Sequence, residues 1–273
     1  MTPCRTARRA RRLAFILALL AALPASAQQL LRLSTTTSTD SSGLLQYLLP
    51  EFEAQTKIHV QVIAVGSGKA LELAKNGDVD VTLVHARAAE DKFVADGHGV
   101  DRRDVMHNDF VIVGPAFDPA GIKGGADVLV ALRKIAASGA RFISRGDNSG
   151  TEQMEQSYWK QLGSKPQGHQ YVSAGLGMGE VLNMASQLAA YTLSDRATYA
   201  AYRQKTGLAI LCQGDPKMFN PYGIIAVNPA KYPDVNYAGA QQLIKWITSP
   251  HGQQRIAAFK AEGQQVFFPD ARK

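Results

Sequence analysis

The chain has 273 residues, of which 30 are Lys or Arg and 23 are Asp or Glu, so its formal net charge is +7. Five of the basic residues are Arg within the first 12 positions, which leaves 25 basic against 23 acidic residues in the rest of the chain. A nearly neutral chain has no basic footprint for nucleic acid, so we exclude nucleic-acid binding. The six His show no H-x-x-x-H or H-E-x-x-H spacing, so we expect neither a built metal site nor a cofactor.

The N-terminus has the layout of a secretory signal peptide. The Arg-rich start is followed by an apolar run at 13–23 and then by Ala25 and Ala27, which form an A-x-A cleavage signal. The apolar run is too short to span a bilayer, which takes about 20 residues. We therefore expect residues 1–27 to be removed and the mature protein to be periplasmic, by either the Sec or the twin-arginine route. Cys212 is then the single cysteine, which excludes an internal disulfide.

Beyond this segment, short apolar runs alternate with amphipathic stretches, a pattern that predicts an α/β fold. In chain order, we expect strands at 30–33, 58–65, 79–84, 110–113, 141–144 and 223–227. Helical spacing predicts helices at 44–52, 69–75, 126–138, 149–161, 175–190, 237–248 and 250–259. The mature chain is long enough for two lobes.

Three polar turns occupy the same kind of position, each after a predicted strand and before a predicted helix. They are 34–40 (S-T-T-T-S-T-D), 66–68 (G-S-G) and 144–152 (S-R-G-D-N-S-G-T-E). In open α/β sheets, ligands lie beyond the carboxyl ends of strands, where helices begin. Helix N-termini attract anions through unpaired N–H groups, and hydroxyl groups add further donors. The three turns therefore predict a donor-rich cage around a small anion.

Arg145 gives the third turn its positive charge. A guanidinium group can hold two oxygens of an oxyanion at once, and Asp147 can orient it. Simpler interpretations remain open, because Ser and Thr before a helix often act only as N-caps, and Arg145 with Asp147 can form an ordinary surface ion pair.

The same segments carry a resemblance to known families. Residues 145–151 (R-G-D-N-S-G-T) are similar to the R-x-D-x-S-G-T loop of periplasmic phosphate-binding proteins. The run at 34–39 and the segment 191–196 (Y-T-L-S-D-R) resemble more specifically the tungstate-binding proteins of the TupA type. Residues 65–71, 84–86 and 224–229 fit that pattern too, so the resemblance extends from about residue 30 to near the C-terminus.

This resemblance implies a type II periplasmic-binding-protein fold. Each lobe would be a mixed, mainly parallel sheet with flanking helices, and the anion would lie in the cleft between the lobes. We expect residues 28–113 and 223–273 in the first lobe and 114–222 in the second. The ligand residues carried over by position are Thr36, Thr37, Ser38, Ser67, His85, Arg145, Ser149, Gly150 and Thr151, with Asp147 orienting Arg145.

The resemblance also implies a binding protein, not an enzyme, that delivers its anion to the membrane permease and ATPase of an ABC importer. We expect a monomer with tungstate or molybdate as its ligand. Phosphate binders place an Asp at the end of the third strand, where this chain has His85. Phosphate keeps a proton at neutral pH and needs an acceptor, whereas tungstate is fully ionised, so we interpret His85 as a donor that disfavours phosphate. A structural, hydrogen-bonded His is the alternative.

Several functional alternatives stay open. Molybdate matches tungstate in size and charge, and sulfate and phosphate are further candidate ligands. A candidate of another class is an exported phosphate-ester hydrolase with Ser149 as nucleophile, for which the sequence offers no evident base. A sensory role at a membrane receptor is compatible with the same binding site.

Overall fold

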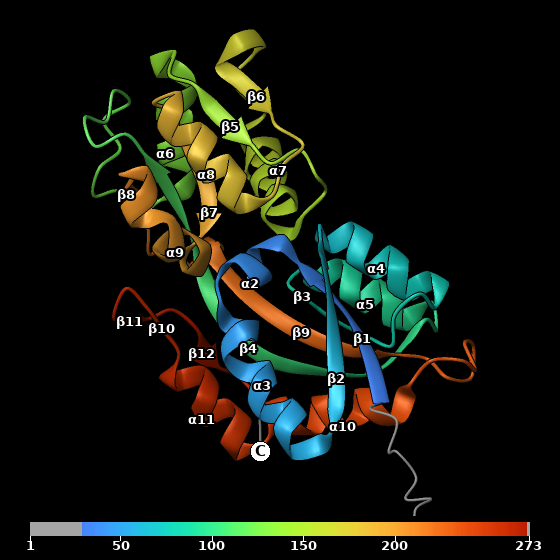
Figure 1. Cartoon of the computed structure of the whole chain (residues 1–273). Helices are drawn as coiled ribbons and strands as arrows, with labels where there is room; N and C mark the ends of the chain where they lie inside the picture. Colours follow the sequence, from blue (N-terminus) through green and yellow to red (C-terminus); the bar gives the residue numbers. More distant parts are fainter. Residues whose placement is uncertain (1–28, 272–273) are drawn as a thin grey trace, which may run out of the picture.

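The computed structural model describes residues 29–271, so the predicted signal peptide at 1–27 lies outside the described residues. Within the part that is described, no helix is both long enough and apolar enough to cross a bilayer. The chain forms two α/β lobes, and the strands β4 (Gly99–Gly114) and β9 (Phe219–Val227) pass from one lobe to the other (Figure 1).

The sheet of the first lobe has the strand order β12-β4-β9-β3-β1-β2. The strand β1 (Gln29–Thr36) is parallel to β2 (Ile58–Val65) and to β3 (Val81–Val84), whereas β9 is antiparallel to both β3 and β4. The strand β12 (Phe268–Pro269) adds a short antiparallel edge beside β4. Because β1, β2 and β3 are parallel, their carboxyl ends meet at one edge of the sheet, and the first two polar turns begin there.

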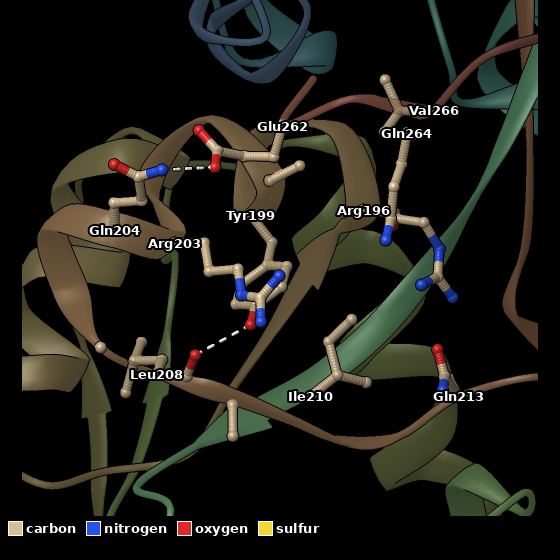
Figure 2. Close-up of a pocket in the computed structure, with 13 residues that line it drawn as sticks. Arg196, Tyr199, Arg203, Gln204, Leu208, Ile210, Gln213, Glu262, Gln264 and Val266 are labelled. Carbon is tan, nitrogen blue, oxygen red and sulfur yellow. Dashed lines mark hydrogen bonds between the residues drawn. The ribbon is translucent and has the colours of Figure 1, made fainter. Parts of the chain in front are cut away.

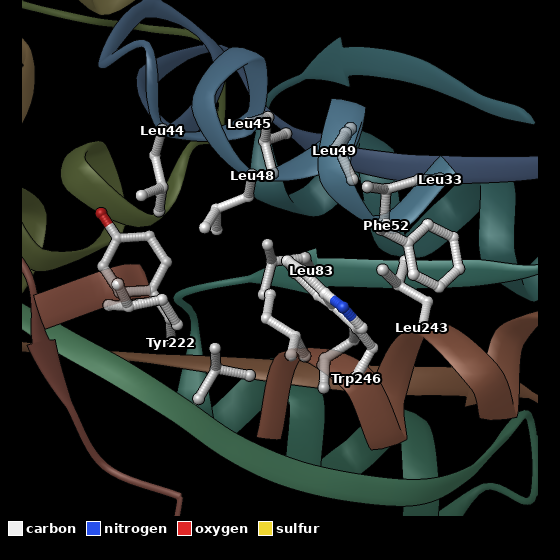
Figure 3. Close-up of a cluster of buried hydrophobic side chains, with 14 of the residues drawn as sticks. Leu33, Leu44, Leu45, Leu48, Leu49, Phe52, Leu83, Tyr222, Leu243 and Trp246 are labelled. Carbon is white, nitrogen blue, oxygen red and sulfur yellow. The ribbon is translucent and has the colours of Figure 1, made fainter. Parts of the chain in front are cut away.

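Helices cover both faces of this sheet. Apolar residues at Leu44, Leu45, Leu48, Leu49 and Phe52 line one side of α3 (Leu44–Thr56), and they pack with residues of β1, β3 and α10 (Tyr237–Thr248), as Figure 3 shows. The helix α11 (Pro250–Ala258) contributes to the same cluster. The helices α4 (Ser67–Asn76) and α5 (Arg87–Ala95) form a separate apolar cluster with β3 and β9.

In the second lobe, the end of β4 pairs antiparallel with β7 (Thr192–Asp195) and β8 (Ala209–Cys212). The short strands β5 (Phe142–Ser144) and β6 (Tyr171–Ser173) pair in parallel. One apolar cluster lies under α6 (Val128–Ser138) and α7 (Gly150–Leu162) and includes the buried, free Cys212. Another is formed by α8 (Met178–Gln187) with α9 (Arg196–Thr206).

The remaining elements are short. The helix α2 (Thr37–Ser41) follows β1 directly and lies at the junction of the lobes (Figure 1). Two 3₁₀ turns are η1 (Gly168–Gln170) and η2 (Pro216–Met218), and the strands β10 (Lys260–Ala261) and β11 (Gln264–Gln265) form a hairpin near the C-terminus.

The predicted α/β class is confirmed, and the strand at 58–65 and the helix at 237–248 have the predicted bounds. The predicted strand at 30–33 is longer, because Ser34 and Thr35 continue it. Their hydroxyls donate to the carbonyls of Ala70 and Leu83, so the polar side chains are satisfied inside the sheet. The predicted strand at 110–113 is the last part of the 16-residue β4, whose polar first half lacks the alternation of a strand.

The lobe boundaries, 28–113 with 223–273 against 114–222, remain a prediction. In β4, the partner strand changes from β9 at Asp109 to β7 at Phe110. In β9, Phe219 already pairs with Asp109. We therefore propose that the crossings lie near Phe110 and Phe219, a few residues before the predicted positions.

A buried carboxylate ties the first lobe together. Asp80 is 1% exposed and accepts a hydrogen bond of 2.7 Å from the backbone N of Arg32. It also accepts from Nη2 of Arg32 at 2.7 Å and from the backbone N of Asn236 at 2.8 Å. This side chain therefore links β1 to the residue that caps α10.

We predict that Asp80→Ala lowers the free energy of unfolding by about 3 kcal/mol, because it leaves a cation and buried N–H groups without their acceptor. Urea unfolding followed by circular dichroism measures the change. Asp91→Ala is the matched control, because it removes an ion pair with Arg87 in which both side chains are 53% exposed. Equal stabilities of the two variants would contradict the prediction.

Candidate functional site

The three polar turns each lead into a helix whose first residues they cap. Thr36 is the N-cap of α2, and its Oγ1 accepts from the backbone N of Thr39 at 3.1 Å. Gly66 precedes α4, which begins at Ser67. Ser149 is the N-cap of α7, and its Oγ accepts from the backbone N of Glu152 at 3.2 Å. The N-cap interpretation of Thr36 and Ser149 is therefore confirmed. An N-cap side chain accepts a hydrogen bond, so it can still donate one to a ligand.

Direct contacts bring the turns of the two lobes together. The backbone N of Gly150 donates to Oγ of Ser67 at 3.0 Å, and the backbone N of Gly68 donates to the carbonyl of Asn148 at 3.3 Å. Nη2 of Arg145 donates to Oγ1 of Thr37 at 2.7 Å. The N-terminal ends of α4 and α7 thus meet at the junction of the lobes, where α2 also lies.

Two glycines make this close approach possible. A Cβ atom on Gly66 would lie 2.6 Å from the carbonyl oxygen of Asp147, and one on Gly150 would lie 2.6 Å from the carbonyl oxygen of His85. Both distances are far inside normal contact, so any larger residue would hold the turns apart.

Arg145 is buried at the centre of these contacts, with 1% of its surface exposed. Its Nη2 bonds to Thr37 and to the carboxylate of Asp147, which also accepts from the backbone N of Ser149 at 3.2 Å. The interpretation of Arg145 and Asp147 as a surface pair is therefore wrong. Within residues 29–271, Nε and Nη1 of Arg145 have no hydrogen-bond partner, and neither does Oγ1 of Thr151. Buried donors without partners are costly, so they indicate a functional group that must meet an acceptor.

Three hydroxyl groups around Arg145 are already used as acceptors. Thr37 accepts from Arg145, Ser67 from the backbone of Gly150, and Ser149 from the backbone of Glu152. None of the three donates a hydrogen bond within the described part of the chain. A hydroxyl has a single hydrogen, and here it remains available for a ligand that accepts.

His85 lies beside Thr36 and Ser38, at the end of β3. Its Nε2 is 3.2 Å from Oγ of Ser38 and from Oγ1 of Thr36, and its Nδ1 is 2.9 Å from Oδ1 of Asn220. The pKa of His85 is lowered to about 4, chiefly by burial; the hydrogen bond to Asn220 opposes this shift, and the positive charge of Arg145 adds to it. His85 is therefore neutral at neutral pH.

This protonation state changes the expected role of His85. Because Oδ1 of Asn220 can only accept, the single ring proton is on Nδ1, and Nε2 is an acceptor for the hydroxyls of Thr36 and Ser38. The expectation that His85 contacts the anion stays a prediction, although in this tautomer Nε2 carries no proton to donate. The alternative of a hydrogen-bonded structural His fits the geometry.

The structure thus places all the predicted residues around the junction, and their function as ligand residues stays a prediction. Sequence reasoning missed Thr39 and Asn220. Thr39 lies 2.6 Å from Thr36 through their hydroxyls, and its place three residues after the N-cap could have indicated this contact. Asn220 is 135 positions from His85, so no local pattern could have joined them.

A hollow lies elsewhere, between α9, β8 and the β10–β11 hairpin (Figure 2). Its volume is about 860 Å³, and none of the predicted ligand residues lines it. Polar groups in its walls bond to one another: Nε2 of Gln204 donates to Glu262 at 2.6 Å, and the hydroxyl of Tyr199 donates to the carbonyl of Leu208 at 2.8 Å. Across residues 29–271, no cluster of three or more His, Cys, Asp or Glu could hold a metal ion.

Two lobes whose helix N-termini meet around a buried arginine define the class of two-lobed solute-binding proteins. The family model of the PBP superfamily domain matches residues 23–251. The tungstate-binding protein TupA of Peptoclostridium acidaminophilum is 49% identical over 245 residues, which are 88% of this chain and 86% of that protein.

Solved structures agree with this match. The tungstate ABC transporter structure from Geobacter sulfurreducens has a TM-score of 0.79 and 55% identity, and the alignment covers 86% of this chain and all of that one. The tungstate-binding protein TupA from Desulfovibrio alaskensis G20 has a TM-score of 0.75 and 47% identity, with 89% and 100% of the chains covered. The chain belongs to the TupA family within the PBP superfamily.

This membership confirms the predicted periplasmic-binding-protein fold and the prediction of a binding protein rather than an enzyme. The hydroxyl of Ser149 is held as the N-cap of α7, where it accepts from the backbone N of Glu152.

The lowered pKa of His85 predicts a pH-dependent stability. The unfolded chain takes up a proton on this ring near its ordinary pKa of 6.5, whereas the folded chain resists it down to about 4. Protonation of His85 therefore leaves the free energy of unfolding unchanged above pH 6.5. As the pH drops from 6.5 to 4, it lowers this free energy by about 3 kcal/mol.

Urea unfolding at pH 7 and at pH 4 tests this prediction, because carboxylates titrate equally in the wild type and in His85→Gln. The variant should lose less stability than the wild type over this interval. His169→Gln, at an exposed position, should follow the wild type. If His85→Gln loses as much stability as the wild type, the buried neutral ring is contradicted.

Proposed function

We propose that this protein captures tungstate between its two lobes and delivers it to the membrane permease and ATPase of an ABC importer. The observation that carries the proposal is the buried guanidinium of Arg145. In the described part of the chain, two of its nitrogens lack a partner, and nearby hydroxyls have unused hydrogens. Its TupA relatives are named for tungstate binding. Periplasmic location and a monomeric state belong to the same proposal.

In the proposed site, Arg145 supplies the positive charge, and Asp147 holds its guanidinium group in position. The hydroxyls of Thr37, Ser67, Ser149 and Thr151 donate to the oxygens of the anion, and the backbone around Gly150 lets the anion approach the N-terminus of α7. Thr36 and Ser38 complete the cage from the N-terminus of α2, in contact with His85.

A cage of donors around a guanidinium favours a fully ionised anion. Tungstate carries no proton at neutral pH, whereas phosphate keeps one and must donate it. The nearby carboxylate of Asp147 is engaged by Arg145 and by the backbone of Ser149, and Nε2 of His85 faces two hydroxyls. We therefore expect phosphate to bind poorly. Molybdate has the same charge and a similar size, so it is the nearest competitor.

The number of donors is sufficient for tight binding. Each hydrogen bond to a charged partner contributes about 1.5–3 kcal/mol net. About seven such bonds would offset the cost of association and give a dissociation constant on the order of nanomolar, near −12 kcal/mol. An anion that touches turns from both lobes stabilises the closed arrangement through contacts that the open one lacks.

We predict that calorimetric titration of the wild type with tungstate gives a dissociation constant on the order of nanomolar, and that phosphate binds far more weakly. Arg145→Ala should weaken tungstate binding by about 100-fold or more, because two or more charge-assisted hydrogen bonds are lost. Molybdate titrated in parallel measures the selectivity between the two closest anions.

Arg133→Ala is the matched control, since Arg133 is exposed on α6 in the same lobe, and it should bind tungstate like the wild type. Thermal unfolding of both variants shows whether the fold is intact. A wild type that prefers phosphate would overturn the choice of tungstate. Wild-type affinity in a folded Arg145→Ala would remove Arg145 from the site.

A further inference from the structure

A ring of buried hydrogen bonds connects the anion site to the strands that cross between the lobes. Oδ1 of Asp195 accepts from the backbone N of Thr198 at 2.8 Å, and Oγ1 of Thr198 donates to the carbonyl of Ser38 at 3.0 Å. Oγ of Ser38 lies 3.2 Å from Nε2 of His85. On this side, the ring runs from the N-cap of α9 in the second lobe to α2 in the first.

The other side of the ring passes through two asparagines. Nδ1 of His85 bonds to Oδ1 of Asn220 at 2.9 Å, and Nδ2 of Asn220 donates to Oδ1 of Asn108 at 2.6 Å. Nδ2 of Asn108 lies 3.4 Å from Oδ1 of Asp195 and closes the ring. Each of these residues is at most 4% exposed, so water does not compete for the bonds.

The ring lies where the lobes are joined. Asn108 of β4 and Asn220 of β9 are opposite each other in the sheet, two residues before β4 changes its partner from β9 to β7. Asp195 ends β7 and belongs to the Y-T-L-S-D-R segment, whose role the anion cage itself does not explain.

The carboxylate of Asp195 sets the direction of the hydrogen bonds that lead through Asn108 and Asn220 to His85. Oδ1 of Asp195 accepts the N–H of Thr198, so Asn108 must turn its NH₂ group toward Asp195 and its oxygen toward Asn220. Asn220 then presents its oxygen to His85, and the single proton of the imidazole must be on Nδ1. The direction of each amide follows from its neighbour, back to the carboxylate.

We propose that Asp195, Asn108 and Asn220 are positioning residues of the anion site, because they hold His85 in the tautomer that turns an unprotonated Nε2 toward the hydroxyls of Thr36 and Ser38. The proposal rests on the function proposed above. Thr39 then donates to Thr36, Thr36 donates to Nε2, and the hydrogen of Ser38 is left to donate to the anion. The hydroxyl orientations are therefore fixed before binding, which lowers the entropy cost of forming the complex.

The tautomer can be measured without any ligand. In protein labelled with ¹⁵N in its histidines, the signal of His85 is assigned by its loss in His85→Gln. The wild type at pH 7 should show a proton on Nδ1 and none on Nε2. Asn220→Leu removes the acceptor for that proton, so the signal should shift toward the Nε2-protonated tautomer.

The same variants are then titrated with tungstate by calorimetry. Asn220→Leu should bind about tenfold more weakly, which is the contribution of roughly one hydrogen bond. Asn228→Leu is the matched control, because Asn228 directly follows β9 at its other end, and its amide donates to the carbonyl of Gly97 at 2.9 Å, far from the cage in sequence and register. It should lower the melting temperature and leave the affinity unchanged.

A proton on Nε2 of the wild type at pH 7 would overturn the proposal, and so would wild-type affinity in folded Asn220→Leu. If Asn220→Leu does not fold, Asn108→Leu breaks the ring one step farther from His85 and should cause the same two changes. If neither the wild type nor Asn228→Leu binds tungstate, the proposed function fails, and the tautomer measurement still shows whether the ring holds His85 as inferred.

Discussion

A buried guanidinium with nitrogens that no protein atom satisfies is expensive, because a cation removed from water loses several kcal/mol of hydration. Arg145 carries this cost at the junction of the two lobes, where Asp147 and Thr37 are its hydrogen-bond partners among the residues that the structure describes. The surrounding architecture follows from that constraint. Neutral donors gather around the cation, the nearby carboxylate is turned to Arg145, and His85 is kept uncharged.

The fold supplies this arrangement by placing strand ends side by side. Parallel pairing of β1 with β2 and β3 brings the first two polar turns to one edge of a sheet. The third turn comes from the other lobe, and Gly66 and Gly150 allow the backbones to come close enough for direct hydrogen bonds. Two helix N-termini and one arginine thereby meet at a point that no single lobe could enclose.

Much of this could be predicted from local sequence patterns. Alternating apolar residues located β2, and hydroxyl-rich turns before amphipathic helices located the donors, because both signals depend on neighbours in the chain. Arg145 could be identified because it is the one basic residue in the polar turn at 144–152. The extent of β4 was missed, because its first half is polar and pairs through its backbone with β9, which is far away in the sequence.

The role of His85 shows why other features of the site could not be predicted from the sequence. A histidine at a strand end can donate or accept, and the choice depends on Asn220, Asn108 and Asp195, which approach it from three other strands. Buried polar residues inside otherwise apolar strands were the available hint, but their partners are set by tertiary register. Local chemistry therefore predicts which groups are present, and packing determines the direction of their hydrogen bonds.

Diffraction at the tungsten absorption edge, from crystals grown with tungstate, tests the central claim most directly. The account predicts one strong anomalous peak at the junction of the lobes, with anion oxygens about 2.7–3.1 Å from Nε or Nη1 of Arg145 and from the hydroxyls of Thr37 and Ser67. A peak in the hollow beside α9, or an anion held without Arg145, would contradict it.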